Sequence, residues 1–268
     1  MFWIRDIEVL AGGKKFESLG DNSLNIDFDI SFGDSKEPDV SEVTIYNLSD
    51  DSINQIKKDG HCIVNAGYKS LGNKGNILSG DIEEVNTSWR DLDKETKIKV
   101  TDGGKSWRKS WISKTYKENT KASLIMRDIV NIMGYEIVEI KPKNDRVYKL
   151  GKAINGYCSD VLKMLVKDTD SKMFVNKNRI TIREEGSGFE TGLVLSAESG
   201  LVGSPTMNRD NTGDKKEKIT WEVRSLLNPK IETDSLIMIK SKVLDGKFRV
   251  IKGKHTKDFE TVITVEEA

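Results

Sequence analysis

The strongest constraint on the fold is an alternation of apolar and polar side chains, with a period of two residues, at both ends of the chain. In the segment 24–32, apolar residues occupy every even position and polar residues every odd one. Successive side chains on a β-strand point to opposite faces, so this pattern predicts a half-buried strand. Shorter runs predict strands at 3–10, 43–46, 62–68, 77–85 and 97–101. Their spacing is typical of an antiparallel sandwich or barrel.

The middle of the chain changes to a helical period. Apolar residues in 122–133 recur at helical spacing, and they are Ala122, Ile125, Met126, Ile129, Val130 and Met133. Gly134 ends this predicted helix, and a strand follows at 135–140. A second helix is expected to begin with Ser159 as its cap and to bury Val161, Leu162, Leu165 and Val166. A hairpin with turn residues 176–178 completes a compact α+β unit at about 108–186.

The segment Glu184–Gly188 is the best linker candidate. Beyond it the period of two resumes at 219–223, 236–239, 248–251 and 262–265. Residues 210–216 are predicted to form an exposed, mobile loop. The layout is therefore mostly β with an α+β insert: domains at 1–107, 108–188 and 189–268.

A short helix is predicted at 49–59, between two strands. Ser49 can cap its first N–H groups, and Leu48 and Ile53 form a hydrophobic staple pair. Gly60 suits a left-handed C-terminal residue. About ten residues form only a marginal helix in water, so packing must hold it. We expect it to close one end of a small barrel.

Composition excludes several classes of protein. The 268 residues contain 43 Lys and Arg and 43 Asp and Glu, so no net charge steers the chain toward nucleic acid or anionic lipid. No apolar run is long enough to predict a membrane span. Charges in the first eight residues predict no signal peptide. Cys62 and Cys158 are expected to be buried, reduced thiols of a chain made in a cytosol.

The sequence predicts no catalytic, cofactor-binding or metal-binding residues, and hence no enzyme. His61 and His255, the only histidines, lie in different predicted domains and outside any zinc-ligand motif. Adjacent acids at 50–51, 83–84 and 184–185 are typical of solvated surfaces, because acid–base pairs need burial to separate their pKa values.

The run Trp107-Arg108-Lys109-Ser110-Trp111 has two readings. Aromatic rings beside cations can stack on nucleic acid. The alternative, which zero net charge favours, is that the tryptophans cover a domain junction with their cationic neighbours in solvent.

Ordered segments along the chain resemble bacteriophage tail baseplate hub proteins, which are related to the N-terminal part of type VI secretion spikes. The first is FDISFGDSKEPDVSEVTIYNLSDDSINQIKKDGHCIVNAGYKSLGNKGNILSGDIEEV. The others are TGLVLSAESGLVGSPTM, LLNPKIETDSLIMIKS and DGKFRVIKGKHTKDFETVITVEEA. The resemblance implies that the domains at 1–107 and 189–268 are tube-like antiparallel β-barrels.

The resemblance also implies a structural role without cofactors. A homotrimer would join the six-fold tail tube to the three-fold central spike and other baseplate proteins, with DNA passing through its lumen. It would be made in the host cytoplasm and located in the tail baseplate of a phage or phage-derived bacteriocin. Larger hubs carry C-terminal spikes or hydrolases, whose roles we expect partner proteins to fill here. The Lys-, Asn- and Ile-rich composition favours a contractile-type tail of a Gram-positive host.

An alternative from another class is an enzyme or carbohydrate-binding module of the tail tip that acts on the host envelope. It predicts a cleft with converging acids or exposed aromatics, for which Trp89, Trp107 and Trp111 are the candidates.

Overall fold

A computed structural model describes residues 4–33, 38–102, 104–210 and 218–268. The described chain is mostly β, with four α-helices in those residues, which confirms the predicted fold class. The predicted loop at 210–216 falls almost entirely outside the described residues. No helix in the described part is long and apolar enough to cross a membrane.

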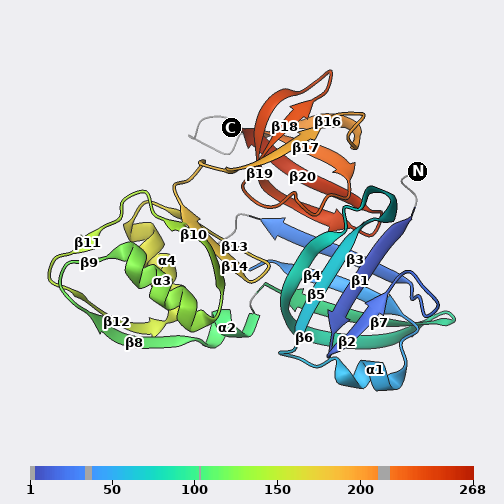
Figure 1. Cartoon of the computed structure of the whole chain (residues 1–268), viewed down its shortest axis with the longest axis horizontal. Coiled ribbons are helices and arrows are strands. Elements are labelled where there is room, and N and C mark those ends of the chain that lie inside the picture. The colour runs from blue at the N-terminus through green and yellow to red at the C-terminus, as the bar shows by residue number, and fades with distance from the viewer. Residues whose placement is uncertain (1–3, 34–37, 103, 211–217) are drawn as a thin grey trace.

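The N-terminal β unit contains seven antiparallel strands that curve around one core (Figure 1). They are β1 (Arg5–Ala11), β2 (Lys14–Glu17), β3 (Ile26–Gly33), β4 (Val40–Tyr46), β5 (His61–Tyr68), β6 (Gly75–Arg90) and β7 (Asp93–Thr101). Their order is β3-β4-β7-β6-β5-β1-β2. The backbone N–H of Leu24 donates to the Glu17 carbonyl at 2.9 Å. The two outermost strands of this order, β3 and β2, therefore approach each other where the chain enters β3.

The helix between β4 and β5 is shorter than the sequence predicts. Helix α1 spans Asp50–Gln55, where residues 49–59 are expected. The Ser49 side chain accepts from the Ser52 N–H as an N-cap, as predicted. The helix ends at Ile56, whose extended backbone lets its side chain enter the core. The residue with a left-handed backbone after this helix is Asp59, and not Gly60 as predicted.

The middle unit packs three helices against short strands. Its elements are α2 (Gly104–Lys109), β8 (Trp111–Tyr116), β9 (Thr120–Lys121), α3 (Ala122–Met133), β10 (Glu136–Lys141), β11 (Val147–Tyr148), β12 (Lys152–Tyr157), α4 (Cys158–Asp168), β13 (Lys172–Asn176) and β14 (Arg179–Arg183). All six apolar residues predicted for the first helix are buried, and Gly134 is its left-handed C-cap. Helix α4 buries its four predicted residues.

One prediction for α4 is wrong. Its N-cap is Tyr157, which makes no capping bond through its side chain, and the helix begins one residue before Ser159. The N–H of Cys158 instead donates to the Ser110 carbonyl at 2.9 Å. This bond continues the pairing of β12 with β8, so strand β12 leads directly into the helix without a side-chain cap.

The C-terminal β unit contains β15 (Phe189–Leu195), β16 (Leu201–Asp210), β17 (Lys218–Leu226), β18 (Ser235–Lys240), β19 (Asp245–Thr256) and β20 (Glu260–Glu267). Their order is β16-β17-β20-β19-β18-β15, antiparallel except for β15 beside β18. The segment 184–188 connects β14 to β15 without regular structure, as the linker prediction requires.

The two β units share one sheet, because β19 pairs antiparallel with β3 from Lys252↔Gly33 to Thr256↔Asp29 (Figure 1). A Cβ on Gly253 would lie 2.7 Å from the Phe32 ring, so this crossing requires glycine. The turn after β19 also places the ring of Phe259 in the N-terminal core. The first and last parts of the chain are therefore joined through backbone and core.

Candidate functional site

The residues weighed for chemistry lie apart. His61 is exposed on β5, with its Nδ1 3.6 Å from Asp81 Oδ1. His255 is buried on β19, with its Nδ1 2.9 Å from the Thr261 hydroxyl. Burial lowers the pKa of His255 to about 3, and the charge of Lys177 acts in the same direction. The described residues contain no group of three or more His, Cys, Asp or Glu able to hold a metal.

Both cysteines are buried as free thiols, as predicted. Burial raises the pKa of the Cys62 thiol to about 12 and also raises that of Cys158. The thiolate is the reactive form of cysteine. Neither thiol is therefore poised for nucleophilic chemistry at neutral pH.

The three adjacent acid pairs all meet cations at the surface. Lys94 contacts Asp50, Lys99 contacts Glu84, and Arg108 contacts Glu83. The third pair, Glu184 and Glu185, contacts lysines of the middle unit. These carboxylates form ordinary surface ion pairs, as the sequence suggested.

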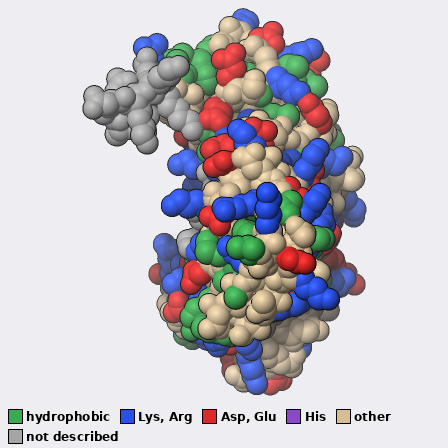
Figure 2. All heavy atoms as spheres, turned by 90° about the vertical axis from the view of Figure 1, so that its left-hand side faces the viewer, with side chains coloured by type: hydrophobic (Ala, Val, Ile, Leu, Met, Phe, Trp, Pro, Cys, Tyr) green, Lys and Arg blue, Asp and Glu red, His purple; other side chains and the backbone are tan. Residues whose placement is uncertain are grey.

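The tryptophans do not converge on one cleft. Trp107 is buried in the middle unit and packs edge-on against Tyr135. Trp111 is exposed on β8 beside Tyr157. Trp89 is exposed near the end of β6, in the N-terminal unit. Figure 2 shows Lys and Arg interspersed with Asp and Glu over the face on the middle-unit side, which is unlike a nucleic-acid-binding stripe.

The most distinctive polar site lies where the three units meet, at the tip of the β13–β14 hairpin. Lys177 and Asn178 have φ of 54° and 58°, as in a two-residue hairpin turn. Lys177 Nζ donates to the Asn76 carbonyl of β6 and to Glu232 Oε1 before β18, both at 2.6 Å. Burial lowers the pKa of Lys177, and Glu232 opposes this shift. One side chain therefore ties the middle unit to both β units.

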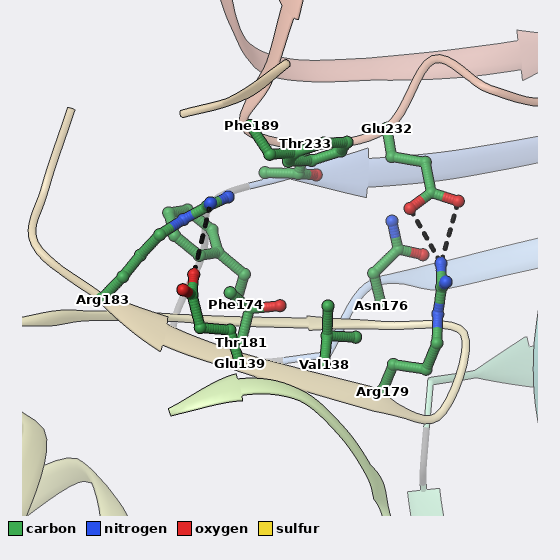
Figure 3. A pocket seen from close by; sticks show the side chains of 10 residues that line it. All are labelled: Val138, Glu139, Phe174, Asn176, Arg179, Thr181, Arg183, Phe189, Glu232 and Thr233. Carbon is green, nitrogen blue, oxygen red and sulfur yellow. Dashed lines mark hydrogen bonds and ion pairs between the residues drawn. The ribbon is translucent and has the colours of Figure 1, made fainter. Parts of the chain in front are cut away.

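Glu232 also binds Arg179, at the start of β14. The guanidinium donates to both carboxylate oxygens, at 2.9 and 2.8 Å (Figure 3). Such a two-point contact fixes direction as well as distance. This pair and the Lys177 contact form one cluster, at one end of the interface between the middle unit and the C-terminal β unit.

A second cluster lies at the other end and centres on Asp234, whose side chain is 1% exposed. Arg183 of β14 lies 2.5 Å from Asp234 Oδ2, and Arg249 of β19 donates to Oδ1 at 2.9 Å. Arg249 also binds Glu266, and Arg183 lies 3.7 Å from Glu139. Buried charges are tolerated when each is paired with an opposite charge, as these are.

A cavity of about 350 Å³ separates the two clusters (Figure 3). Val138, Phe174 and Phe189 line it with apolar surface. Two other lining residues, Arg183 and Thr233, are buried, and each has a polar atom without a hydrogen-bond partner among the described residues. We call this space the junction cavity.

Asp102 adds a titratable group beside the first cluster. It follows β7 and is buried, and it accepts a hydrogen bond from the Lys177 backbone N–H. Burial raises the pKa of its carboxyl to about 7. Its Oδ1 has no partner among the described residues. Together the two clusters hold three units in one orientation, which is a structural and not a chemical arrangement.

Sequence reasoning did not find these junction residues. One signal was present: Arg179, Thr181 and Arg183 occupy alternate positions of a strand and therefore share its face. Their partners, Glu232 and Asp234, lie far along the chain in an irregular segment, where no period marks them.

Known proteins resemble this chain in sequence pattern and in fold. A family model described as baseplate hub gp41 matches residues 7–248. The 43 kDa tail protein of prophage MuSo2 from Shewanella oneidensis has a TM-score of 0.71 at 11% identity, with 98% of each chain covered. No curated protein matches the chain.

Two further solved structures share the fold. The tail protein from Neisseria meningitidis MC58 has a TM-score of 0.68 at 10% identity, over 99% of this chain and 97% of the other. The E. coli c3393 protein, a type VI secretion component, has a TM-score of 0.57 at 11% identity, over 91% and 74% respectively.

Proposed function

Because the chain belongs to the baseplate hub gp41 family, we propose that three copies of it form a ring that joins the six-fold tail tube to the three-fold central spike. The chain is a structural component of a phage tail baseplate. The trimer, the tube contact and the spike contact are the proposal.

The observation that carries the proposal is the pairing of β19 with β3, which holds two mainly antiparallel β units together in one chain (Figure 1). We propose that these units are variants of one tube-like barrel, within domains 1–107 and 189–268 that flank the domain 108–188. Three such chains present six β units around a three-fold axis. A closed three-fold ring can then meet a six-fold ring without open ends.

The junction clusters support this role, because a ring of six matched units requires each chain to hold its two units at a fixed angle. Asp234 and Glu232 each receive cations from the middle unit. The middle unit thus acts as a brace against the C-terminal unit. Breaking such buried pairs is strongly destabilising, so the angle resists thermal motion.

Zero net charge suits a conduit through which DNA passes. Each phosphate contact made by Lys or Arg adds affinity for DNA. Strong cationic patches would therefore slow its passage. A trimer structure with a central channel densely lined by Lys and Arg would contradict this part of the proposal.

We propose that the chain has no enzymatic activity of its own and is made in the cytoplasm of the bacterial host. The family is a structural one. The alternative, an envelope-acting enzyme or carbohydrate-binding module, needs converging groups. Trp107 is buried and Trp89 and Trp111 lie on different units, which weakens that alternative.

Native mass spectrometry and electron microscopy at high protein concentration test the proposal, first with the protein alone and then with the tail-tube and spike proteins. A ring-shaped trimer that caps tube protein supports it. A chain that stays monomeric with both partners present contradicts it, and cell-wall hydrolysis by that monomer would favour the alternative.

A further inference from the structure

The hairpin that joins β6 to β7 carries an exposed apolar tip. Leu92, in its turn, is 92% exposed, and Trp89, on β6 shortly before the turn, is 71% exposed. Figure 1 shows this hairpin extending beyond the rest of the N-terminal unit. An isolated apolar residue at the surface is ordinary, but two of them at one projecting turn form a knob.

The knob is held in place by polar contacts at its base. The Asn47 side chain donates to Asp93 at 2.8 Å and accepts from the Lys94 N–H at 3.0 Å. Lys94 Nζ lies 2.9 Å from Asp50 at the start of α1. The tip is therefore presented in a fixed position, which lowers the entropic cost of binding.

The junction cavity has the complementary properties. Its walls include Val138, Phe174 and Phe189, and Val138 is exposed on β10. Arg183 Nε and the Thr233 hydroxyl lie buried and without partners among the described residues. Buried donors are normally satisfied, so these two point to a ligand that brings oxygen acceptors together with an apolar group.

We propose that the tip of the β6–β7 hairpin of one copy enters the junction cavity of the next copy. Leu92 supplies the apolar group. The carboxylates of Asp91 and Asp93 on either side supply acceptors once the side chains of Arg183 and Thr233, which are buried in the single chain, turn toward the incoming hairpin. A carboxylate accepts several hydrogen bonds, so Asp93 can keep its contact with Asn47.

The geometry of such a contact leads to a ring. The knob and the cavity lie on different parts of the surface, because the knob is in the N-terminal unit and the cavity is lined by residues of the middle and C-terminal units. A contact between two different surfaces of identical chains is heterologous and closes into a ring when its rotation permits. The inference rests on the proposed trimer and names its contact.

Paired cysteines test the contact directly. In the double variant Leu92→Cys with Val138→Cys, a short bis-maleimide should join neighbouring copies into covalent trimers on a denaturing gel. The matched control pairs Leu92→Cys with Val243→Cys, which is equally exposed but lies before β19, away from the cavity. Cys62 and Cys158 are buried and do not compete.

The possible results separate the contact from the trimer. Trimers from the 92/138 pair and not from the 92/243 pair support the proposal. A native trimer that the 92/138 pair fails to link overturns the hairpin contact and leaves the proposed function intact. Ladders longer than three copies support the contact and overturn the trimer. Linkage by neither pair and no native trimer overturns both.

A second variant needs no reagent. Leu92→Asp removes the apolar group at an exposed position, where folding is not affected, and should weaken trimerisation by at least about tenfold. Trp111→Ser, an exposed aromatic removed elsewhere, should leave it unchanged. Equal effects of the two substitutions would overturn the proposal.

Discussion

Replacing Asp234 by asparagine should weaken the docking of the middle unit on the C-terminal β unit, although the contacts of Glu232 remain. Asparagine keeps the volume and tolerates the left-handed backbone at this position, where φ is 67°. It removes the one negative charge that contacts both Arg183 and Arg249. Arg249 keeps the carboxylate of Glu266, whereas Arg183 keeps a hydrogen bond to the Gly188 carbonyl and, as its carboxylate partner, the half-exposed Glu139 at 3.7 Å.

The expected loss follows from that incomplete compensation. Removing one partner of a buried ion pair lowers the free energy of unfolding by about 3 to 5 kcal/mol. Because Glu266 and Glu139 still compensate part of the arginine charge, we expect a loss at the lower end of this range, about 3 kcal/mol. For a chain of this size, a loss of about 3 kcal/mol lowers the melting temperature by roughly 6 to 12 °C. Differential scanning calorimetry on wild type and variant, at one concentration and pH, measures the change.

The matched control is Asp29→Asn, which breaks an exposed pair with Lys254. Its loss should stay below about 0.5 kcal/mol, since exposed pairs contribute little. A double-mutant cycle of Asp234→Asn with Arg183→Gln should return a coupling of at least about 1 kcal/mol. A coupling near zero, or equal effects of the buried and exposed substitutions, would refute the assignment of Asp234 as the contact that docks the middle unit.

Three further substitutions have defined outcomes. Ser49→Ala removes the cap of α1 and should cost about 1 kcal/mol by urea unfolding, while no change would mean that packing alone sets the helix start. Ile129→Ala should cost about 2 to 5 kcal/mol, because its side chain is fully buried in α3, and a loss below 1 kcal/mol would contradict that packing. The His255 pKa of about 3 lies below its ordinary 6.5. The unfolded chain therefore takes up the proton first, and stability present above pH 6.5 is lost as pH falls toward 3. Between pH 7 and 4 the wild type should lose about 3 kcal/mol more than His255→Gln, and parallel profiles would refute this.

Local pattern was enough to predict the elements that bury their own side chains. The helical spacing from Ala122 to Met133 defines α3 to the residue, because all six apolar positions face one core. The predicted start of α4 is one residue late, because strand β12 leads directly into the helix and Tyr157, not Ser159, stands at the cap position. Helix α1 is shorter than predicted because the core takes up Ile56, where the local pattern favours another helical turn.

Long-range pairing leaves no comparable mark. Strand β19 reads as half-buried from its own sequence, but nothing in its period names β3 as the neighbour. The junction clusters cannot be predicted from the sequence for the same reason, because an ion pair does not fix how far apart its two residues lie along the chain. Only the two arginines that share one face of β14 indicated that this strand has a polar partner.

The pairing of β3 with β19 has a consequence for how the chain is made. Asp29 pairs with Thr256 in that register, so one edge of β3 stays unpaired until the segment that contains Thr256 has left the ribosome. At 5 to 20 residues per second, that delay is roughly 10 to 45 s. The middle unit is complete earlier and can fold while the emerging N-terminal strands still offer an open edge to neighbouring nascent chains. Slower synthesis would lengthen this vulnerable interval, and a truncation before β19 would make it permanent.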